Sequence, residues 1–162
     1  QLNDLFSIAK DNEKSTQKMH NLTLSLISCQ YLHEASALLE SQLVKEFSVD
    51  FAAVKLLSVG NAVLDSESAL RLDENSPQAK ELKKLIHKRE PVCGFFELLD
   101  FSKLNKEDLK SMAVMPLFVD KNNCFGALIL ASVDKEHFSP DSGTLFLKNL
   151  GEVVSYSFVK YL

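Results

Sequence analysis

Cysteine is the residue type of this 162-residue chain with the clearest potential for nucleophilic or redox chemistry. The chain contains Cys29, Cys93 and Cys124, an odd number at wide spacing. A thiol enzyme needs a thiolate of low pKa and a resolving partner within reach, and this spacing contains no paired motif. Because free cysteines are mostly small buried hydrophobic residues, the spacing favours structural roles.

Metal and phosphate motifs are also missing from the sequence. The spacings that bind zinc, such as His at i and i+4, do not occur among His20, His33, His87 and His137. There is no glycine-rich phosphate loop and no nucleophile elbow, and the carboxylates are scattered. The sequence therefore predicts a protein that is not an enzyme, with no catalytic residue, no metal and no cofactor.

Basic residues gather in one stretch, as Lys80, Lys83, Lys84, Lys88 and Arg89. On a helix they would share the face opposite its apolar residues. This pattern favours a solvated helix face, and an anion or nucleic-acid patch is the alternative.

The overall composition indicates a folded, water-soluble domain, with 46% hydrophobic and 25% charged residues. The net charge is −4 and only two basic residues are arginines, so we do not expect direct nucleic-acid binding. The longest apolar run, Phe125–Val133, is too short to span a bilayer, so no membrane association is expected. The odd cysteine set suits a reducing compartment, and we expect a cytoplasmic protein.

The first 47 residues contain neither Gly nor Pro, which predicts helix. A heptad pattern runs along residues 1–30, apolar at its ends and polar in its middle. We expect this N-terminal helix to lead into a domain over residues 31–162 and to form a homodimer. The predicted dimerisation residues are Leu2, Leu5, Ala9, Asn12 and Met19. For Met19–Cys29, packing on the helix's own domain is an equal alternative.

The rest of the chain reads as a second helix, several strands and a final long helix. In the first half we expect a helix over 32–47, strands over 51–58 and 62–64 separated by a Gly60-Asn61 turn, and a loop with a short strand at 69–72. A helix from Ser76-Pro77 to Arg89 follows, then an extended segment over 91–98 and helical turns over 105–111. The last segments are strands over 113–120 and 124–133, joined by a hairpin, and a helix of about twenty residues from Ser139-Pro140-Asp141. Whether the first two helices are continuous or kinked near Ser28–Tyr31 stays open. This order predicts an α+β fold with an antiparallel sheet between helices.

Three stretches of the sequence carry a family resemblance. They are Met19–Leu26 (MHNLTLSL), Glu90–Gly94 (EPVCG) and Phe138–Glu152 (FSPDSGTLFLKNLGE). With them, the chain from about Leu5 to Leu162 resembles the bacterial GAF-like family of unknown function DUF484. Two departures from the family pattern are Ser142, where Met is common, and Tyr31, where an acidic residue is common.

The resemblance implies a GAF fold, with five or six antiparallel strands and the first and last helices packed together on one face. It also implies dimerisation through those helices, and it names no ligand. In a GAF fold, small molecules lie between the sheet and the crossing loops, which are residues 59–76 and 92–111 of this chain. The candidate ligand-binding residues, which either line such a cavity or fill it, are Cys93, Phe95, Phe96, Phe101 and Met115.

The leading interpretation is a non-enzymatic GAF-like regulatory or scaffolding module that acts as a homodimer, with an unidentified protein partner. One alternative is a small-molecule sensor with a pocket under residues 92–118. Another is a thiol redox enzyme centred on Cys93, because a Val-Cys-Gly string also occurs in GAF proteins that reduce free methionine sulfoxide. The second cysteine motif of those enzymes is missing here.

Overall fold

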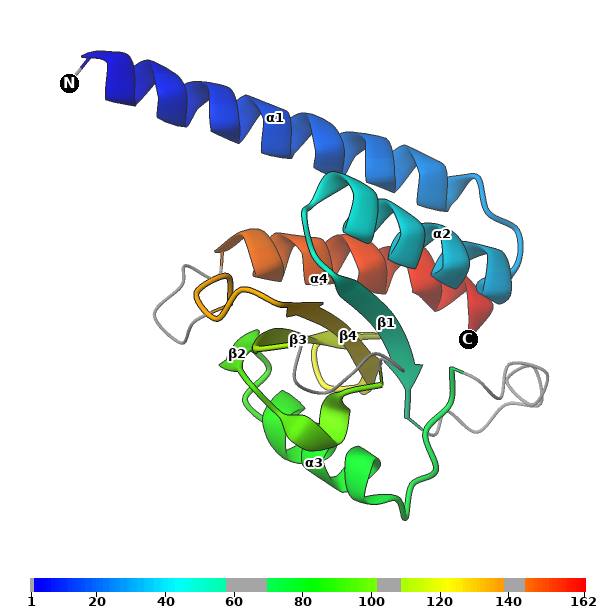
Figure 1. Ribbon diagram of the computed structural model, residues 1–162. Helices are drawn as coiled ribbons and strands as arrows, with labels where there is room; N and C mark the ends of the chain where they lie inside the picture. The colour runs from blue at the N-terminus through cyan, green and yellow to red at the C-terminus, as the bar shows by residue number, and fades with distance from the viewer. Residues whose placement is uncertain (1, 58–69, 102–108, 139–144) are drawn as a thin grey trace.

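The computed structural model describes residues 2–57, 70–101, 109–138 and 145–162, with the backbone alone for residues 2–13 (Figure 1). Its centre is an antiparallel sheet with the strand order β1-β4-β3-β2. The strands are β1 (Phe51–Leu56), β2 (Val92–Gly94), β3 (Ser111–Phe118) and β4 (Cys124–Ser132). The α+β class is confirmed, and the described residues form four strands where the resemblance implies five or six.

Helices cover both faces of this sheet. They are α1 (Leu2–Ile27), α2 (Leu32–Glu46), α3 (Pro77–Ile86) and α4 (Leu145–Phe158), with short 3-10 helices η2 (Glu97–Leu99) and η3 (Val159–Tyr161). Helix α2 packs on β1, α4 packs on β3, and α1 lies against both α2 and α4 (Figure 1). Helix α3 lies on the opposite face, with η2 beside it.

Strand alternation divides the hydrophobic core between the two faces. On β3, Ala113, Met115 and Leu117 face the layer of α1, α2 and α4, whereas Met112 and Val114 face α3. All five side chains are at most 1% exposed. The sheet is therefore buried on both sides, as its nearly continuous apolar strands require.

The start of α3 confirms the capping signal in the sequence. The Ser76 hydroxyl accepts a hydrogen bond from the Ala79 N–H at 3.1 Å, and Pro77 occupies the first turn. The predicted end at Arg89 is wrong, because α3 ends at Ile86. Arg89 instead has a left-handed backbone, with φ of 60°, and turns the chain towards Pro91.

The first two helices are not continuous, because α1 ends at Ile27 and α2 begins at Leu32. This answers whether they form one helix, which the sequence leaves open. Two residues of η3, which follows α4, bond to the chain at this break. Lys160 Nζ donates to the carbonyl oxygens of Ile27 and Cys29, at 3.2 and 2.9 Å, and the Tyr161 hydroxyl donates to Cys29 O at 2.9 Å. These donors satisfy carbonyls at and just past the end of α1 that its own backbone cannot bond.

The predicted hairpin between β3 and β4 is confirmed. The Asp120 carboxylate accepts hydrogen bonds from the N–H groups of Asn122 and Asn123, at 2.8 and 3.0 Å. These bonds and the amide of Asn123 hold the pKa of Asp120 below its ordinary value. The four polar residues Asp120–Asn123 thus form a hydrogen-bonded turn between the two strands.

Other expected elements differ from the structure or lie outside the described residues. The strand expected near 69–72 is a single parallel bridge between Leu56 and Arg71, and Ser111, expected in a helical turn, begins β3. The Gly60-Asn61 turn, the strand at 62–64, residues 105–108 and the Ser139-Pro140-Asp141 cap lie outside the described part. Among the described residues, no helix combines the length and apolar character needed to cross a membrane.

Candidate functional site

The structure divides the five predicted ligand-binding residues between the two faces of the sheet. Cys93 and Met115 pack into the core under α4 and its neighbouring helices, and Met115 is fully buried. Phe96 and Phe101 pack against the core on the α3 side. Phe95 is 42% exposed. Because they belong to the cores on opposite faces of the sheet, Cys93 and Met115 do not line one cavity with Phe96 and Phe101 in the described part of the chain.

Cys93 and Cys124 lie in environments that disfavour the thiolate. Burial raises the pKa of the Cys93 thiol, and burial also raises the pKa of Cys124, whose thiol donates to Gly126 O at 3.2 Å. An activated cysteine needs the opposite shift. Within the described residues, no group of three or more His, Cys, Asp or Glu side chains is arranged to hold a metal ion.

A groove of about 690 Å³ lies beside α4, and we call it the α4 groove. It is bounded by α4, by the end of β3, by the β3–β4 hairpin and by the segment Arg89–Pro91. Its apolar wall includes Met115, Pro116, Leu147 and Gly151. Pockets that bind ligands typically have this size and this mainly apolar lining.

Two hydrogen-bonded contacts fix the walls of the α4 groove. The Ser155 hydroxyl donates to Gly151 O at 2.7 Å and accepts from the Phe118 N–H at 3.0 Å, which ties α4 to the end of β3. The Arg89 guanidinium donates to the carbonyl oxygens of Lys121 and Asn122, which ties the chain after α3 to the hairpin. The groove is therefore a built feature of the fold.

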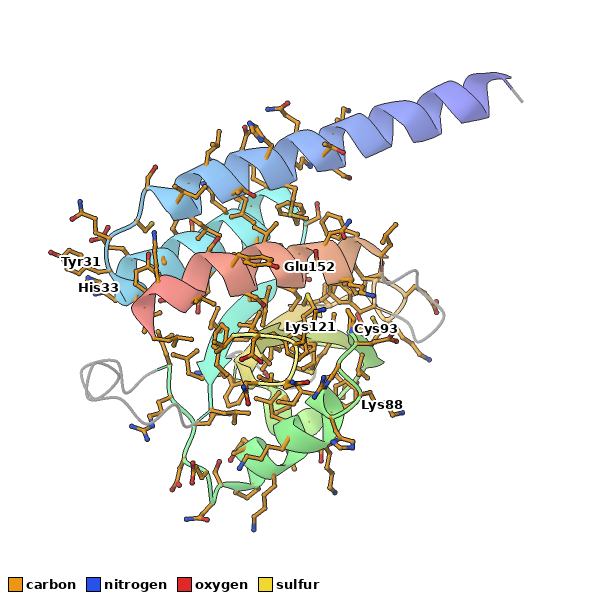
Figure 2. The ribbon with its side chains drawn as sticks, turned by 180° about the vertical axis from the view of Figure 1, so that it is seen from behind. Tyr31, His33, Lys88, Cys93, Lys121 and Glu152 are labelled. Atoms are coloured by element: carbon orange, nitrogen blue, oxygen red, sulfur yellow. The ribbon has the colours of Figure 1, made fainter. Side chains whose placement is uncertain are left out.

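Charged side chains stand along the rim of the α4 groove. Lys121 on the hairpin and Lys148 and Glu152 on α4 are exposed. Figure 2 shows Lys121 between Glu152 on α4 and Lys88 after α3. Within the described part of the chain, the side chains of Lys121, Lys148 and Glu152 make no hydrogen bond or ion pair, so their charges are available to a ligand.

The basic residues of α3 form a second charged surface next to this rim. Lys80, Lys83, Lys84 and His87 border a shallow hollow, and Lys88 follows at the same end of the helix. All five are exposed, because Ala79, Leu82 and Ile86 turn the other side of α3 into the core. The stretch 80–89 contains five Lys or Arg and one acid in a chain whose net charge is −4.

Sequence reasoning missed Lys121, Lys148, Glu152 and Tyr156 as site residues. Three of them follow one another at i, i+4 and i+8 on α4, a spacing that the sequence shows. The same spacing is found on any solvated helix face. This face of α4 is recognised as part of a site only because the end of β3 and the hairpin lie beside it in the structure.

The predicted dimerisation residues have two different placements. Met19 is partly buried against the core of its own domain, next to the buried Leu22 and Leu26. Leu2, Leu5, Ala9 and Asn12 belong to the part of α1 for which the backbone alone is described.

The fold resembles solved GAF domains. The GAF domain of a phosphoenolpyruvate-protein phosphotransferase from Coxiella burnetii matches with a TM-score of 0.64 and 14% identity, over 91% of this chain and 94% of that chain. The corresponding GAF domain from Acinetobacter matches with a TM-score of 0.62 and 16% identity, over 90% and 92%. At these identities the likeness shows the fold alone.

The family model for proteins of unknown function DUF484 matches residues 1–161. A search of curated proteins gives no match. The sequence match, together with the GAF-like architecture, shows that the chain belongs to the DUF484 family.

Proposed function

We propose that the protein is a non-enzymatic GAF-like module with a regulatory or scaffolding role, and that it acts as a homodimer. The observation that carries the proposal is the course of α1, whose N-terminal half extends past the other helices (Figure 1). Every residue from Lys14 to Gln17 is exposed, which is more than one full turn of helix. The described residues of the domain leave this turn uncovered.

The N-terminal half of α1 would be stabilised by a partner, because isolated helices shorter than about 12–15 residues are marginal in water. The heptad positions Leu2, Leu5 and Ala9 provide an apolar stripe for that partner. A second copy of the chain would supply the same stripe. Asn12 at a core position would favour one register of the pair at some cost in stability.

Two apolar side chains are exposed on the part of α1 that packs against the domain. Leu24 and Ile27 are 52% and 62% exposed, although Leu22 and Leu26 on the same helix are buried. Helical periodicity therefore gives α1 a second apolar side that points away from its own core. A dimer that buried it would remove this surface from water.

Sedimentation of the purified chain across the micromolar range tests the dimer. We expect a dimer, and we expect Leu5→Glu to shift it to monomer by placing a charge in the seam. Ser7→Glu is the matched control, because residue 7 lies off the heptad seam and the variant should stay dimeric. A wild-type chain that sediments as a monomer throughout this range would contradict the proposal.

The non-enzymatic part of the proposal is supported by the raised pKa of Cys93, which leaves less thiolate than a free cysteine has. The sensing alternative stays a prediction. The sequence predicts its pocket under residues 92–118, and residues 58–69 and 102–108 lie outside the described part of the chain.

A further inference from the structure

We propose that the α4 groove docks an acidic amphipathic segment of a partner protein. The inference rests on the scaffolding role proposed above and gives the chemistry of the partner. Two features of one surface support it, which are the apolar groove itself and the cations on its rim and on the neighbouring α3.

The apolar part of the surface suits a helical segment. Leu147, Gly151 and Ser155 line the groove at i, i+4 and i+8, which corresponds to about 12 Å along α4. Val119 and Tyr156 at its edge are 43% and 82% exposed, so the groove is open to solvent along one side. An amphipathic helix places apolar anchors at i and i+4 or i+7 over a comparable length.

The charges of the surface favour an acidic partner. Arg89, Lys121 and Lys148 lie around the groove. Lys88 directly precedes Arg89, and the lysines of α3 lie further back in the sequence. Among the described residues that line the groove, the acids are Asp120, whose carboxylate accepts hydrogen bonds from the hairpin N–H groups, and the exposed Glu152 on α4. Cations flanking an apolar groove steer acidic segments and fix their orientation.

A peptide fits this surface better than a nucleic acid does. A phosphate backbone following the cations would meet Glu152 as a like charge in the same groove. A peptide can place a basic side chain or the N-terminus of a helix at Glu152 and its acids at Lys121 and Lys148.

The test is selection of random peptides of about 16 residues, roughly four helical turns, displayed on phage against the full chain. The selection is counter-screened on the Lys121→Glu/Lys148→Glu double variant. We expect enriched peptides with excess Asp and Glu and apolar residues at helical spacing. A synthetic copy should bind the double variant about tenfold more weakly or worse, and more weakly in high salt.

The matched control is Lys14→Glu/Lys18→Glu, which makes the same charge change on α1. Binding to this control should stay within about twofold of the wild type, and both variants should keep the wild-type Tm because they alter surface lysines. Failure to enrich peptides, enrichment of non-acidic peptides, or equal binding to the groove variant would overturn the proposal.

Two further outcomes separate this proposal from that of the dimer. If a single-stranded oligonucleotide displaces the peptide competitively, the surface belongs to nucleic acid and the proposal is wrong. If the groove variant becomes monomeric in sedimentation, the groove is a contact between copies and the proposal is again wrong. Peptide binding by a monomeric wild-type chain would contradict the dimer and leave the docking site standing.

Discussion

Gly126 lies in the middle of the sheet, paired with Leu56 on β1 and Leu117 on β3. A Cβ at this position would overlap the carbonyl oxygen of Lys55, which belongs to the backbone of the neighbouring strand. Gly151 on α4 is also buried, but a Cβ there would lie 3.6 Å from Met115 Cβ and 3.7 Å from Pro116 O, which are ordinary contacts. Only the first glycine is required by close approach.

Replacing each glycine by alanine should therefore change the free energy of unfolding differently. Gly126→Ala should lower the free energy of unfolding by about 2 kcal/mol or more, because β1 and β4 must move apart. Gly151→Ala should leave it unchanged or raise it by up to about 1 kcal/mol, because Ala is the better helix former. Urea denaturation measures both, and equal losses for the two variants would contradict this account.

Among the elements, the β3–β4 hairpin depends on one ionised side chain. Asp120 accepts from Asn122 and Asn123, and its folded pKa is lowered first by the backbone bond from Asn122 and then by the Asn123 side chain. A group whose folded pKa is depressed stabilises the folded state above its unfolded pKa. That contribution is lost as the pH falls through the folded value.

We expect the turn at Asp120 to loosen only at acid pH. The amide resonances of Asn122 and Asn123 should shift with a midpoint below the ordinary Asp value of about 3.8. Asp120→Asn is the control, because its amide oxygen can still accept both bonds but does not titrate. A midpoint above the ordinary Asp value, or an unchanged transition in the control, would show that another group governs the turn.

For the whole molecule, the last residues of the chain fix how α1 leaves the domain. Lys160 and Tyr161 bond carbonyls at Ile27 and Cys29, and the Tyr161 ring packs edge-on against Phe158. These contacts join the two ends of the sequence. The end of α1 is therefore held by η3, and the α4 groove is lined by the helix that directly precedes η3.

Tyr161→Phe should remove one partly buried hydrogen bond and lower the free energy of unfolding by about 1 kcal/mol. Tyr156→Phe makes the same chemical change on the exposed side of α4 and should alter the free energy by less than about 0.5 kcal/mol. Chemical denaturation of the two variants compares them directly. Similar losses of unfolding free energy in the two variants would show that the bond to Cys29 does not contribute to stability.

The sequence by itself determined the local elements, because their signals are local. The Ser76-Pro77 cap, the hairpin at Asp120 and the apolar strands on either side of it follow from residue types and spacing. The order of those elements was enough to predict the α+β class. Family resemblance then predicted the GAF-like architecture, which the solved GAF domains match.

Only the tertiary structure decided where side chains meet. Met115 and Phe96 lie in the cores on opposite faces of the sheet, and a Cβ would clash at Gly126 but not at Gly151. Lys160 bonds the chain just past the end of α1, at Cys29. The α4 groove likewise joins α4 to segments far away in the chain. Such contacts leave no periodic trace in the sequence, because they depend on how distant elements pack.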